Sequence, residues 1–445
     1  MFEYIYNHSP IFFQNIMVSL KGKQFIKQRY THYYYKELNE LKERQNKYEL
    51  QKERLDEFIE YLKNNSKYYK EILTNIDTPI SIQNLESIPI LEKETLKHNI
   101  SKILSTNENL IKMQTGGSTG VGMNFYSSPY DMSRRFAYLD YFKESHGVFK
   151  GMRRASIGGR VLIPNRQKRK IYWRYNKPLN QMLFSAYHAD GEKLHFYIRQ
   201  LNKFKPETID GFTTVIHRLA KYINDNNIEL KFKPIAIFPT AESLTDEMKY
   251  DIEKAFKCPV RNQYSSSEGA PFITENIHGE LEINPETGVF ELQHIQNNIY
   301  ELIVTAFYTT TTPLLRYRIG DSVELYDKLP TNYSQEDIKI KRIIGRNNDF
   351  LISNERGIVT NVNLSTVVKE TGSLVKNSQF VQNELSIIDI FLVTENNINK
   401  EKLEKLLVLK LNTRFGNSTT YKFHYVEEIE KTSGGKTRFT INNID

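Results

Sequence analysis

Cysteine is almost absent from this sequence. Cys258 is the single thiol among 445 residues, which excludes an intramolecular disulfide and a metal site built from several thiolates. The first residues do not form the pattern of a secretory signal. We therefore expect a protein of the reducing cytoplasm.

Long hydrophobic runs are missing as well. The most apolar early stretch, residues 10–20, is interrupted by Gln14 and Asn15, and it is far too short to cross about 30 Å of hydrocarbon. The sequence therefore predicts no transmembrane helix. Hydrophobic residues make up 39% of the chain and charged residues 26%, with 28 Tyr and 25 Phe, which is typical of a folded globular protein. The length exceeds what one core usually covers, so we expect one large domain and at least one smaller one.

The formal net charge is +8. Such a balance suits a polyphosphate substrate, an anionic membrane surface or nucleic acid, and it does not choose among them. The charge alone therefore assigns no partner.

The N-terminal part of the chain, residues 1–75, is predicted to be helical. Residues 31–73 are rich in Lys, Glu, Leu and Tyr and contain no proline or glycine, which indicates one or two long helices. Apolar residues recur there at near-helical spacing: Leu38, Leu41, Leu55, Phe58, Ile59 and Leu62. We expect this face to pack on the body of the protein. A coiled-coil dimer is the alternative, although these positions do not keep a strict heptad.

Beyond residue 78, short apolar runs alternate with helical patterns, which predicts an α/β core. The expected strands are residues 155–163, 207–212 and 234–238, followed by a helix over 246–256, and residues 300–307 and 385–393 are expected as strands in antiparallel surroundings. A composition shift at 345–349 marks a candidate hinge. After it, a strand at 387–393, a helix at 400–411 and a strand at 421–426 predict a small α+β lid. The predicted domains are therefore 1–75, 76–345 and 346–445.

A glycine-rich stretch with several hydroxyl groups is the strongest local motif. Residues 114–122 contain four glycines together with Thr115, Ser118 and Thr119, so backbone N–H groups and hydroxyls can surround an anion. The stretch is not a Walker loop, because no lysine follows its last glycine. A phosphate cradle and an ordinary glycine-rich turn both remain open on local grounds.

A second glycine-rich segment lies near the C-terminus. Residues 432–438 contain Gly434, Gly435 and Lys436, but Glu430 stands where a P-loop requires glycine. Lys436 is instead a candidate for a mobile cation that is delivered to a site. A solvated terminal loop is the alternative.

Three further segments combine aromatic, hydroxyl and charged side chains. Residues 264–269 offer a ring, hydroxyls and a carboxylate, which can stack a base, bond a phosphate and hold Mg²⁺. Residues 317–321 place Asp321 after a glycine turn, suitable for ribose hydroxyls, and residues 344–349 add Arg346. Each segment alone is equally typical of capping or turn chemistry. Their joint order along the chain is much harder to obtain by accident.

This series resembles the core motifs of the adenylate-forming superfamily of acyl-CoA synthetases, adenylation domains and luciferases. Within it, residues 9–15, 238–244 and 267–272 resemble the phenylacetate–CoA ligase branch and its relatives from capsular-polysaccharide gene clusters. The resemblance implies an α/β fold, with a large N-terminal multi-sheet adenylate-forming domain and a small C-terminal α+β lid domain.

The resemblance also implies a role for each motif. The phosphates of ATP would be held by Thr115, Gly116, Gly117, Ser118, Thr119 and Gly120. Glu268 would ligate Mg²⁺, Tyr264 would lie against adenine, and Ser267 would lie near the α-phosphate. Asp321 and Arg346 would bind the ribose, and Lys436 would contact the carboxylate and the α-phosphate. The hinge would be Asn348 and Asp349. Two positions depart from the usual pattern: Asn348 replaces the common Asp or Lys, and Ser265 replaces glycine.

The implied activity is ATP-dependent formation of an acyl-AMP from a carboxylic acid, with release of pyrophosphate. The acyl group would then pass to CoA or a carrier thiol, or to an amine or hydroxyl of a sugar or amino acid, in surface polysaccharide biosynthesis. The expected cofactors are ATP and Mg²⁺, with coenzyme A as one candidate co-substrate, and no nucleic acid partner is expected. No general base is needed, because the acid is already ionised at neutral pH.

Alternatives remain open at this level. A non-catalytic nucleotide-binding or scaffold protein would keep the same fold. The basic, aromatic residues 12–35 fit either a first helix packed on the body or a membrane-surface element at the inner membrane face. For the acyl pocket, Trp173, Tyr175 and His217 are candidate wall residues only because they lie between the nucleotide motifs.

Overall fold

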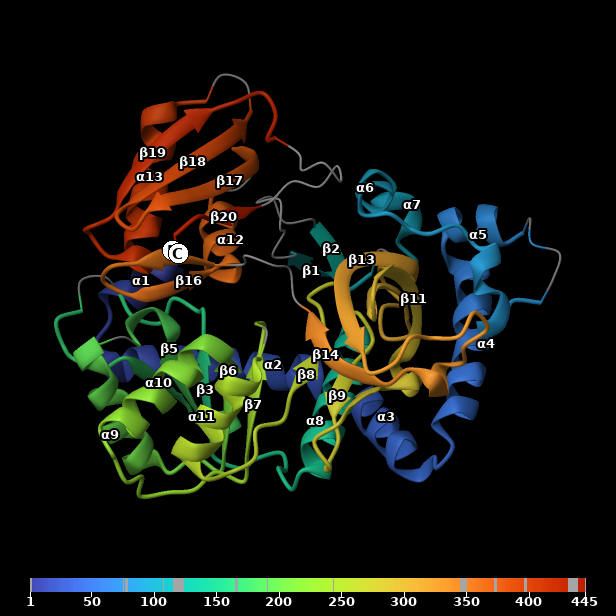
Figure 1. Cartoon of the computed structure of the whole chain (residues 1–445), viewed down its shortest axis with the longest axis horizontal. Helices are drawn as coiled ribbons and strands as arrows, with labels where there is room; N and C mark the ends of the chain where they lie inside the picture. The colour runs from blue at the N-terminus through green and yellow to red at the C-terminus, as the bar shows by residue number, and fades with distance from the viewer. Residues whose placement is uncertain are drawn as a thin grey trace.

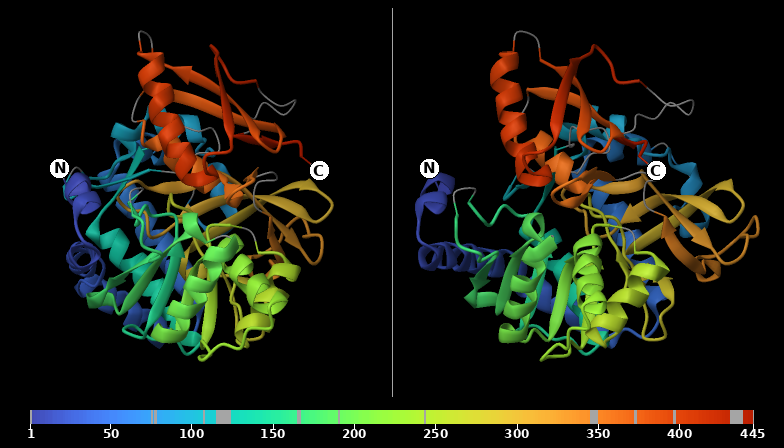
Figure 2. Two further views of the ribbon diagram at one scale, coloured as in Figure 1. Left: turned by 90° about the vertical axis from the view of Figure 1, so that its left-hand side faces the viewer. Right: turned by 60° about the vertical axis from the view of Figure 1, so that its left-hand side comes forward.

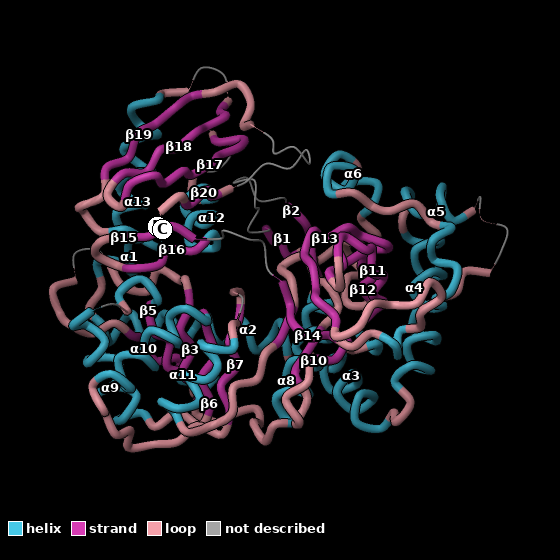
Figure 3. Tube along the Cα trace, viewed as in Figure 1, coloured by secondary structure: helices cyan, strands magenta, loops and turns pink. Residues whose placement is uncertain are grey.

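The computed structural model describes most of the chain, namely residues 2–74, 76, 79–106, 108–114, 124–164, 167–189, 191–242, 244–344, 350–371, 374–395, 398–430 and 439–444. Within these residues the strands form five sheets, and helices cover them (Figures 1 and 3). Several predicted site residues lie outside the described residues: the loop 115–120, the hinge region with Arg346, Asn348 and Asp349, and Lys436. Their roles stay predictions.

Five helices form the N-terminal part: α1 (Phe2–His8), α2 (Ile11–Arg29), α3 (His32–Glu43), α4 (Lys47–Asn65) and α5 (Lys67–Leu73). Polar caps start the later ones, since Asn46 and Ser66 accept hydrogen bonds from the backbone N–H groups of Glu49 and Tyr69. The predicted apolar face is confirmed, because all six of its side chains are buried within this chain. That burial contradicts the coiled-coil alternative.

A five-stranded sheet lies at the centre of one half of the large domain, in the order β4-β5-β3-β6-β7. Its strands are β3 (Arg154–Gly158), β4 (Trp173–Asn176), β5 (Gln181–Ser185), β6 (Thr208–Phe212) and β7 (Ala236–Thr240), and all but the edge strand β4 run parallel. The crossover helices are α9 (Leu194–Phe204) between β5 and β6 and α10 (Thr213–Asp225) between β6 and β7. Helix α11 (Asp246–Phe256) follows β7, and the three helices gather beside the sheet in Figure 1. The predicted strands and helix here are confirmed, with small shifts, whereas β4 and β5 were not predicted.

The other half contains a seven-stranded sheet in the order β11-β12-β13-β14-β10-β9-β8. Its strands are β8 (Gln263–Tyr264), β9 (Ile273–Glu275), β10 (Leu281–Ile283), β11 (Gly288–Gln296), β12 (Ile299–Ala306), β13 (Leu314–Leu325) and β14 (Ile340–Ile344). All pairings are antiparallel, as expected for 300–307. A large apolar cluster packs this sheet against α4 and α5.

Between the halves lie a short hairpin and a long helix. The hairpin pairs β1 (Ile111–Gln114) with β2 (Asn124–Ser127), and the helix is α8 (Pro129–Ser145). The short helices α6 (Lys93–His98) and α7 (Ile100–Ile103) precede the hairpin. The 3₁₀ turns are η1 (Ile82–Ser87), η2 (Lys177–Leu179), η3 (Ala186–His188), η4 (Gly191–Lys193), η5 (Pro285–Thr287) and η6 (Gln335–Asp337).

The C-terminal part has its own apolar core. It lies above the half with the five-stranded sheet in Figure 1 and at the top of the molecule in both views of Figure 2. It contains β15 (Phe350–Ser353), β16 (Gly357–Thr360), α12 (Asn361–Lys369), β17 (Val375–Glu384), β18 (Ile387–Thr394), α13 (Lys400–Phe415), β19 (Thr420–Tyr425) and β20 (Thr440–Asn442). The four-stranded sheet has the order β19-β18-β17-β20. The predicted α/β fold class, with a large multi-sheet domain and a small α+β domain, is confirmed. The domain boundaries stay predictions.

Among the described residues, every helix is too short or too polar to span a bilayer.

Candidate functional site

Helix α8 fixes the turn that leads into β13. Ser128 caps the helix by accepting a hydrogen bond from the N–H of Asp131 at 3.2 Å. The buried Asp131 carboxylate accepts from Thr310, through its N–H at 2.9 Å and its hydroxyl at 2.6 Å, and from the N–H of Thr311 at 2.9 Å. Hydrogen bonds to a buried carboxylate are strong. The start of the strand that carries Asp321 is therefore anchored to α8.

The same helix holds the loop that follows Tyr264. Arg135 donates to the backbone oxygens of Ser266 and Ala270 at 3.2 and 3.3 Å. Burial lowers the pKa of Arg135 to about 10, while nearby acidic groups, Glu268 among them, oppose that shift. The guanidinium is still charged at neutral pH. It therefore fixes a loop of hydroxyl and carboxylate side chains with a permanent cation.

Gly269 allows this loop to turn. Its φ is +107°, and a Cβ there would lie 2.4 Å from Cγ2 of Thr309. The Ser266 hydroxyl accepts from the N–H groups of Gly269 and Ala270 at 3.2 and 3.1 Å. Only glycine fits both the backbone angle and the space. The residues of the turn, Ser267 and Glu268, are held in place by this close packing.

The structure brings Tyr264 and Asp321 together. The Tyr264 hydroxyl donates to Oδ2 of Asp321 at 2.8 Å, from positions 57 residues apart in the sequence. In a flat sheet, four strand spacings of about 4.8 Å would separate β8 from β13 by about 19 Å. The contact therefore requires the seven-stranded sheet to curl. Tyr264, predicted to lie against adenine, and Asp321, predicted to bind the ribose, are therefore in direct contact although they come from separate motifs.

A β-bulge positions Asp321. Glu301 pairs with Ser322 and Ile303 pairs with Arg318, so the three residues 319–321 lie opposite Leu302 alone. Gly320 has a φ of +82° within this bulge. Bulges change the direction of a side chain at a strand. The glycine turn expected from the sequence is therefore a feature inside a strand.

Glu268 stands on the turn as a half-buried carboxylate, between the exposed Ser267 and the buried Gly269. Among the described residues it forms no side-chain hydrogen bond and no ion pair. No group of three potential ligand residues occurs in the described part of the chain. A single carboxylate fits Mg²⁺, which usually binds one or two carboxylates together with substrate phosphates and water.

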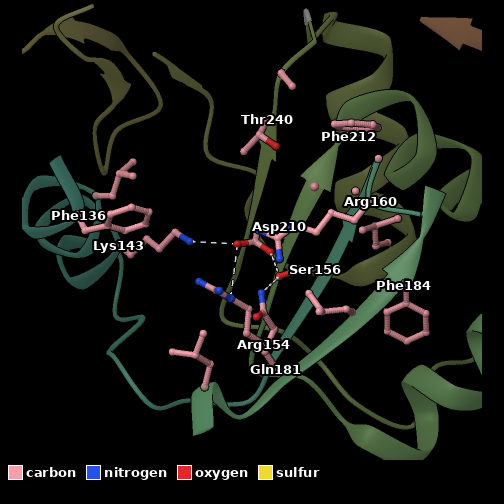
Figure 4. Close-up of a pocket in the computed structure, with 18 of the residues that line it drawn as sticks. Phe136, Lys143, Arg154, Ser156, Arg160, Gln181, Phe184, Asp210, Phe212 and Thr240 are labelled. Atoms are coloured by element: carbon pink, nitrogen blue, oxygen red, sulfur yellow. Dashed lines mark hydrogen bonds and ion pairs between the residues drawn. The ribbon is translucent and has the colours of Figure 1, made fainter. Parts of the chain in front are cut away.

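A cavity of about 360 Å³ lies beside this loop, and Ser265 forms part of its wall. The remaining walls come from β3, β5, β6 and β7, from α8 and from the end of α2. Figure 4 shows the parts that α8 and these strands contribute. The lining includes Gly158, Phe212 and Thr240 at the carboxyl ends of their strands, where ligands of open α/β sheets bind. Because Ser265 directly follows Tyr264, the cavity adjoins the loop that begins after Tyr264.

The carboxylate of Asp210 lines the cavity and is surrounded by polar partners. Asp210 on β6 approaches Nζ of Lys143 at 3.3 Å and Nε of Arg154 at 3.6 Å, and it accepts a hydrogen bond from Ser156. Burial alone would raise the pKa of Asp210, but Arg154 and Lys143 lower it below the ordinary value. Asp210 is therefore ionised at neutral pH. Figure 4 shows these side chains converging from two strands and α8.

These cavity residues were not predicted from the sequence. The available signal was a polar residue inside an apolar strand: Ser156 lies between Ala155 and Ile157, and Asp210 lies between Ile209 and Gly211. A carboxylate within a buried parallel strand needs a partner. That requirement could have indicated a site at these strands.

The three residues predicted for the acyl pocket lie elsewhere. Trp173 and Tyr175 are on the edge strand β4 and pack against the apolar cluster around the five-stranded sheet. His217 on α10 hydrogen-bonds to Oδ2 of Asp251 on α11 at 2.8 Å. None of the three lines the cavity beside Ser265.

Comparison with known proteins supplies the family. A family model described as the CapK C-terminal domain matches residues 351–443. Over 448 aligned positions, the chain is 61% identical to Protein CapK of Staphylococcus aureus, and the match covers 100% of both chains. The chain belongs to the CapK family. The resemblance to relatives from capsule gene clusters is thereby confirmed.

Solved structures supply the fold of this CapK-family chain. A 2-hydroxyisobutyryl-CoA ligase in complex with 2-HIB-AMP and CoA, in the thioesterification state, gives a TM-score of 0.55 at 15% identity and covers 88% of each chain. The same ligase in its postadenylation state, with R3-HIB-AMP, gives 0.50 at 13% identity over 87% of this chain and 88% of the ligase. The CapK-family chain therefore has the fold of adenylate-forming ligases, as its motifs predicted.

Proposed function

We propose that this CapK-family protein activates a carboxylic acid as an acyl-AMP. An oxygen of the carboxylate attacks the α-phosphorus of ATP, and the bond from that phosphorus to the oxygen bridging to the β-phosphate breaks. Pyrophosphate leaves with the electron pair. In the second step a nucleophile attacks the acyl carbonyl and AMP leaves. The observation that carries the proposal is the contact between Tyr264 and Asp321, directly before Ser265, which forms part of the cavity wall.

The site residues receive the following roles. The ring of Tyr264 lies against adenine and Asp321 binds the ribose, with the hydrogen bond between them fixing their relative position. Glu268 holds Mg²⁺, which neutralises charge on the phosphates when bound. Ser267 lies near the α-phosphate.

The residues outside the described part complete the site in this proposal. The loop 115–120 surrounds the phosphates, Arg346 binds the ribose, and Lys436 stabilises charge that develops at the α-phosphate. Asn348 and Asp349 form the hinge through which the small domain rotates between the two steps. These roles rest on the motif resemblance.

The cavity beside Ser265 is the proposed acid site. Its position next to Tyr264 would bring a bound carboxylate to the α-phosphate. The acceptor is a thiol such as that of coenzyme A, or an amine or hydroxyl of a sugar. We further propose a role in surface polysaccharide assembly and a phenylacetate–CoA ligase-like mechanism, and both are supported by the motif resemblance.

The test is acid-dependent exchange of labelled pyrophosphate into ATP across a panel of carboxylic acids. Glu268→Gln and Lys436→Ala should each lower the exchange rate by about 100-fold or more, because each removes transition-state stabilisation. Glu401→Gln is the matched control, since Glu401 is 78% exposed on α13, and it should leave exchange unchanged. Exchange that survives both site substitutions would refute the roles of these residues. Nucleotide binding without exchange for any acid would favour a scaffold protein.

We also propose that α2 contacts a membrane surface. Phe12, Phe13 and Leu20 on this helix are 70%, 55% and 58% exposed, and the helix carries Lys21 and Lys27 nearby. Exposed aromatic rings beside lysines are typical of helices that lie on anionic lipid. Replacing both phenylalanines by serine should reduce co-sedimentation with anionic vesicles and leave pyrophosphate exchange intact. Equal sedimentation of the two proteins would refute the contact.

A further inference from the structure

The cavity beside Ser265 contains more positive than negative side chains. Arg29, Lys143, Arg154 and Arg160 line it, against the two acidic side chains Asp140 and Asp210. Lys143 and Arg154 both face Asp210, and Asp140 accepts a hydrogen bond from the Tyr34 hydroxyl at 2.8 Å. The other two cations, Arg29 and Arg160, therefore give the cavity an excess of positive charge.

Arg29 and Arg160 lie against one aromatic ring. Their guanidinium carbons are 4.6 and 5.4 Å from the centroid of Phe25, and Arg29 is also 3.9 Å from the centroid of Phe136. Aromatic stacking covers the face of a guanidinium and leaves the N–H groups at its edge available to a carboxylate. The two cations are therefore oriented for an anion.

Within the described residues neither arginine forms an ion pair, and Nε of Arg29 is buried without a hydrogen-bond partner. Burial, together with the nearby Arg160, lowers the pKa of Arg29 to about 10, against the attraction of Tyr30 and Asp140. Burial likewise lowers the pKa of Arg160. Both groups stay protonated at neutral pH, so they repel each other across the cavity.

The rest of the lining limits the size and character of a ligand. Apolar side chains complete the wall, namely Phe136, Leu139, Leu162, Leu183, Phe184 and Phe212. A volume of about 360 Å³ is near the lower end of the range for small-molecule sites. The cavity therefore suits a short carbon chain with a charged group at its far end.

We propose that the acid activated here is a small dicarboxylic acid, whose second carboxylate is bound by Arg29 and Arg160. The inference rests on the proposed function. The reacting carboxylate points to the Ser265 side, next to Tyr264, and the carbon chain lies along the apolar wall. A monocarboxylic acid of equal length would bury a methyl group against two charged guanidinium groups, which would leave their donors without partners. Sites of this kind discriminate strongly against the analogue that lacks the polar group.

The experiment compares pairs of acids that differ only in the terminal group. Straight-chain dicarboxylates of three to six carbons, with and without hydroxyl groups, are matched with monocarboxylates of the same length in the pyrophosphate exchange assay. We expect the best dicarboxylate to have a KM at least tenfold below that of its partner. Arg160→Gln and Arg29→Gln should remove this preference and leave the KM for ATP unchanged, and Arg160→Lys should restore part of it.

Arg199→Gln is the matched control, because Arg199 is exposed on α9, and it should keep the wild-type preference. Melting curves without ligand verify that each variant is folded. A preference for monocarboxylates, or an Arg160→Gln variant that raises both KM values equally, overturns the proposal.

Failure of the proposed function would give a different result. If no acid supports exchange with the wild-type protein, the proposed activation reaction fails, and calorimetric titration with the same acid pairs decides the present inference. Dicarboxylate binding that is lost in Arg160→Gln supports the anion site. Absence of dicarboxylate binding to the wild-type protein overturns it.

Discussion

The buried carboxylate Glu37 is the most informative position for stability. It lies within 2.7 Å of Arg54 and of Arg134, and it accepts a hydrogen bond from the Tyr308 hydroxyl at 2.7 Å. Glu37 and Arg54 are each only 4% exposed. These contacts join α3, α4 and α8 to the turn after β12. We predict that Glu37→Gln destabilises the large domain strongly.

The magnitude follows from burial. Breaking a buried ion pair by removing one partner costs about 3–5 kcal/mol, because the other charge is left uncompensated. With an unfolding entropy of about 2.1 cal/mol/K per residue over roughly 345 residues, that cost lowers the melting temperature by about 4–7 °C. Differential scanning calorimetry measures the shift. The matched control is Glu53→Gln, since Glu53 and Arg44 are each 44% exposed, and an exposed pair contributes only about 0–1 kcal/mol.

The pH dependence supplies a second check. Burial alone would raise the pKa of Glu37, but Arg134 and Arg54 lower it below the ordinary value. A lowered folded-state pKa gives stability that is present above the unfolded value of about 4.3 and is lost as the pH falls through the folded value. The difference in melting temperature between wild type and Glu37→Gln should therefore shrink in acid. Equal melting temperatures of the Glu37 and Glu53 variants at pH 7 would refute the reasoning.

Three further predictions concern the loops around the nucleotide residues. Gly269→Ala should lower the pyrophosphate exchange rate with little change in KM for the acid, because the added Cβ would lie 2.4 Å from Thr309 and displace the loop. Steady-state kinetics of the folded variant measure this effect, and a wild-type exchange rate would contradict it. Tyr264→Phe should raise the KM for ATP about tenfold or more, since a hydrogen bond to a carboxylate such as that of Asp321 contributes about 1.5–3 kcal/mol. An unchanged KM for ATP would argue against a joint role of Tyr264 and Asp321 in nucleotide binding. Asp131→Asn should lower the free energy of unfolding by about 2 kcal/mol or more, because one amide oxygen cannot accept all three hydrogen bonds that the carboxylate accepts. Chemical denaturation measures the difference, and equal stability would disprove this anchor.

Local patterns in the sequence predicted several helices and six strands, namely β3, β6, β7, β12, β18 and β19, because their causes are local. The helix at 246–256 begins after the capping residue Thr245, and it was predicted with the bounds that the structure gives to α11. The strands β4 and β5 pair as a local hairpin, but they were missed because the contacts that bury β4 are not local. Arg174 on β4 is fully buried, and its partner Gln14 lies 160 residues earlier at 2.7 Å. No pattern within a short window indicates such a contact.

The same difference between local and non-local causes separates the residues predicted for the nucleotide from the residues of the cavity. Tyr264 and Asp321 were predicted because each lies in a short motif, and the structure shows the two in contact. The cavity residues Arg29, Lys143 and Asp210 belong to three separate elements with no motif around them. Their proximity depends on how α2, α8 and the five-stranded sheet pack. The proposed acid site therefore depends on tertiary structure, while the residues of the proposed nucleotide site lie in recognisable sequence motifs.

Helix α8 links the two sites physically. Asp131 and Arg135 are four residues apart, so they lie on one face of the helix, and they hold the turn before β13 and the loop after Tyr264. Lys143 lies eight residues beyond Arg135, rotated by about 80° around the helix axis, and it reaches Asp210 in the cavity. From Asp131 to Lys143 the helix rises about 18 Å. Because one rigid element contacts all three segments, it fixes the distance between the proposed ribose site and the proposed acid site. We therefore expect a displacement of α8 to disturb nucleotide and acid binding together.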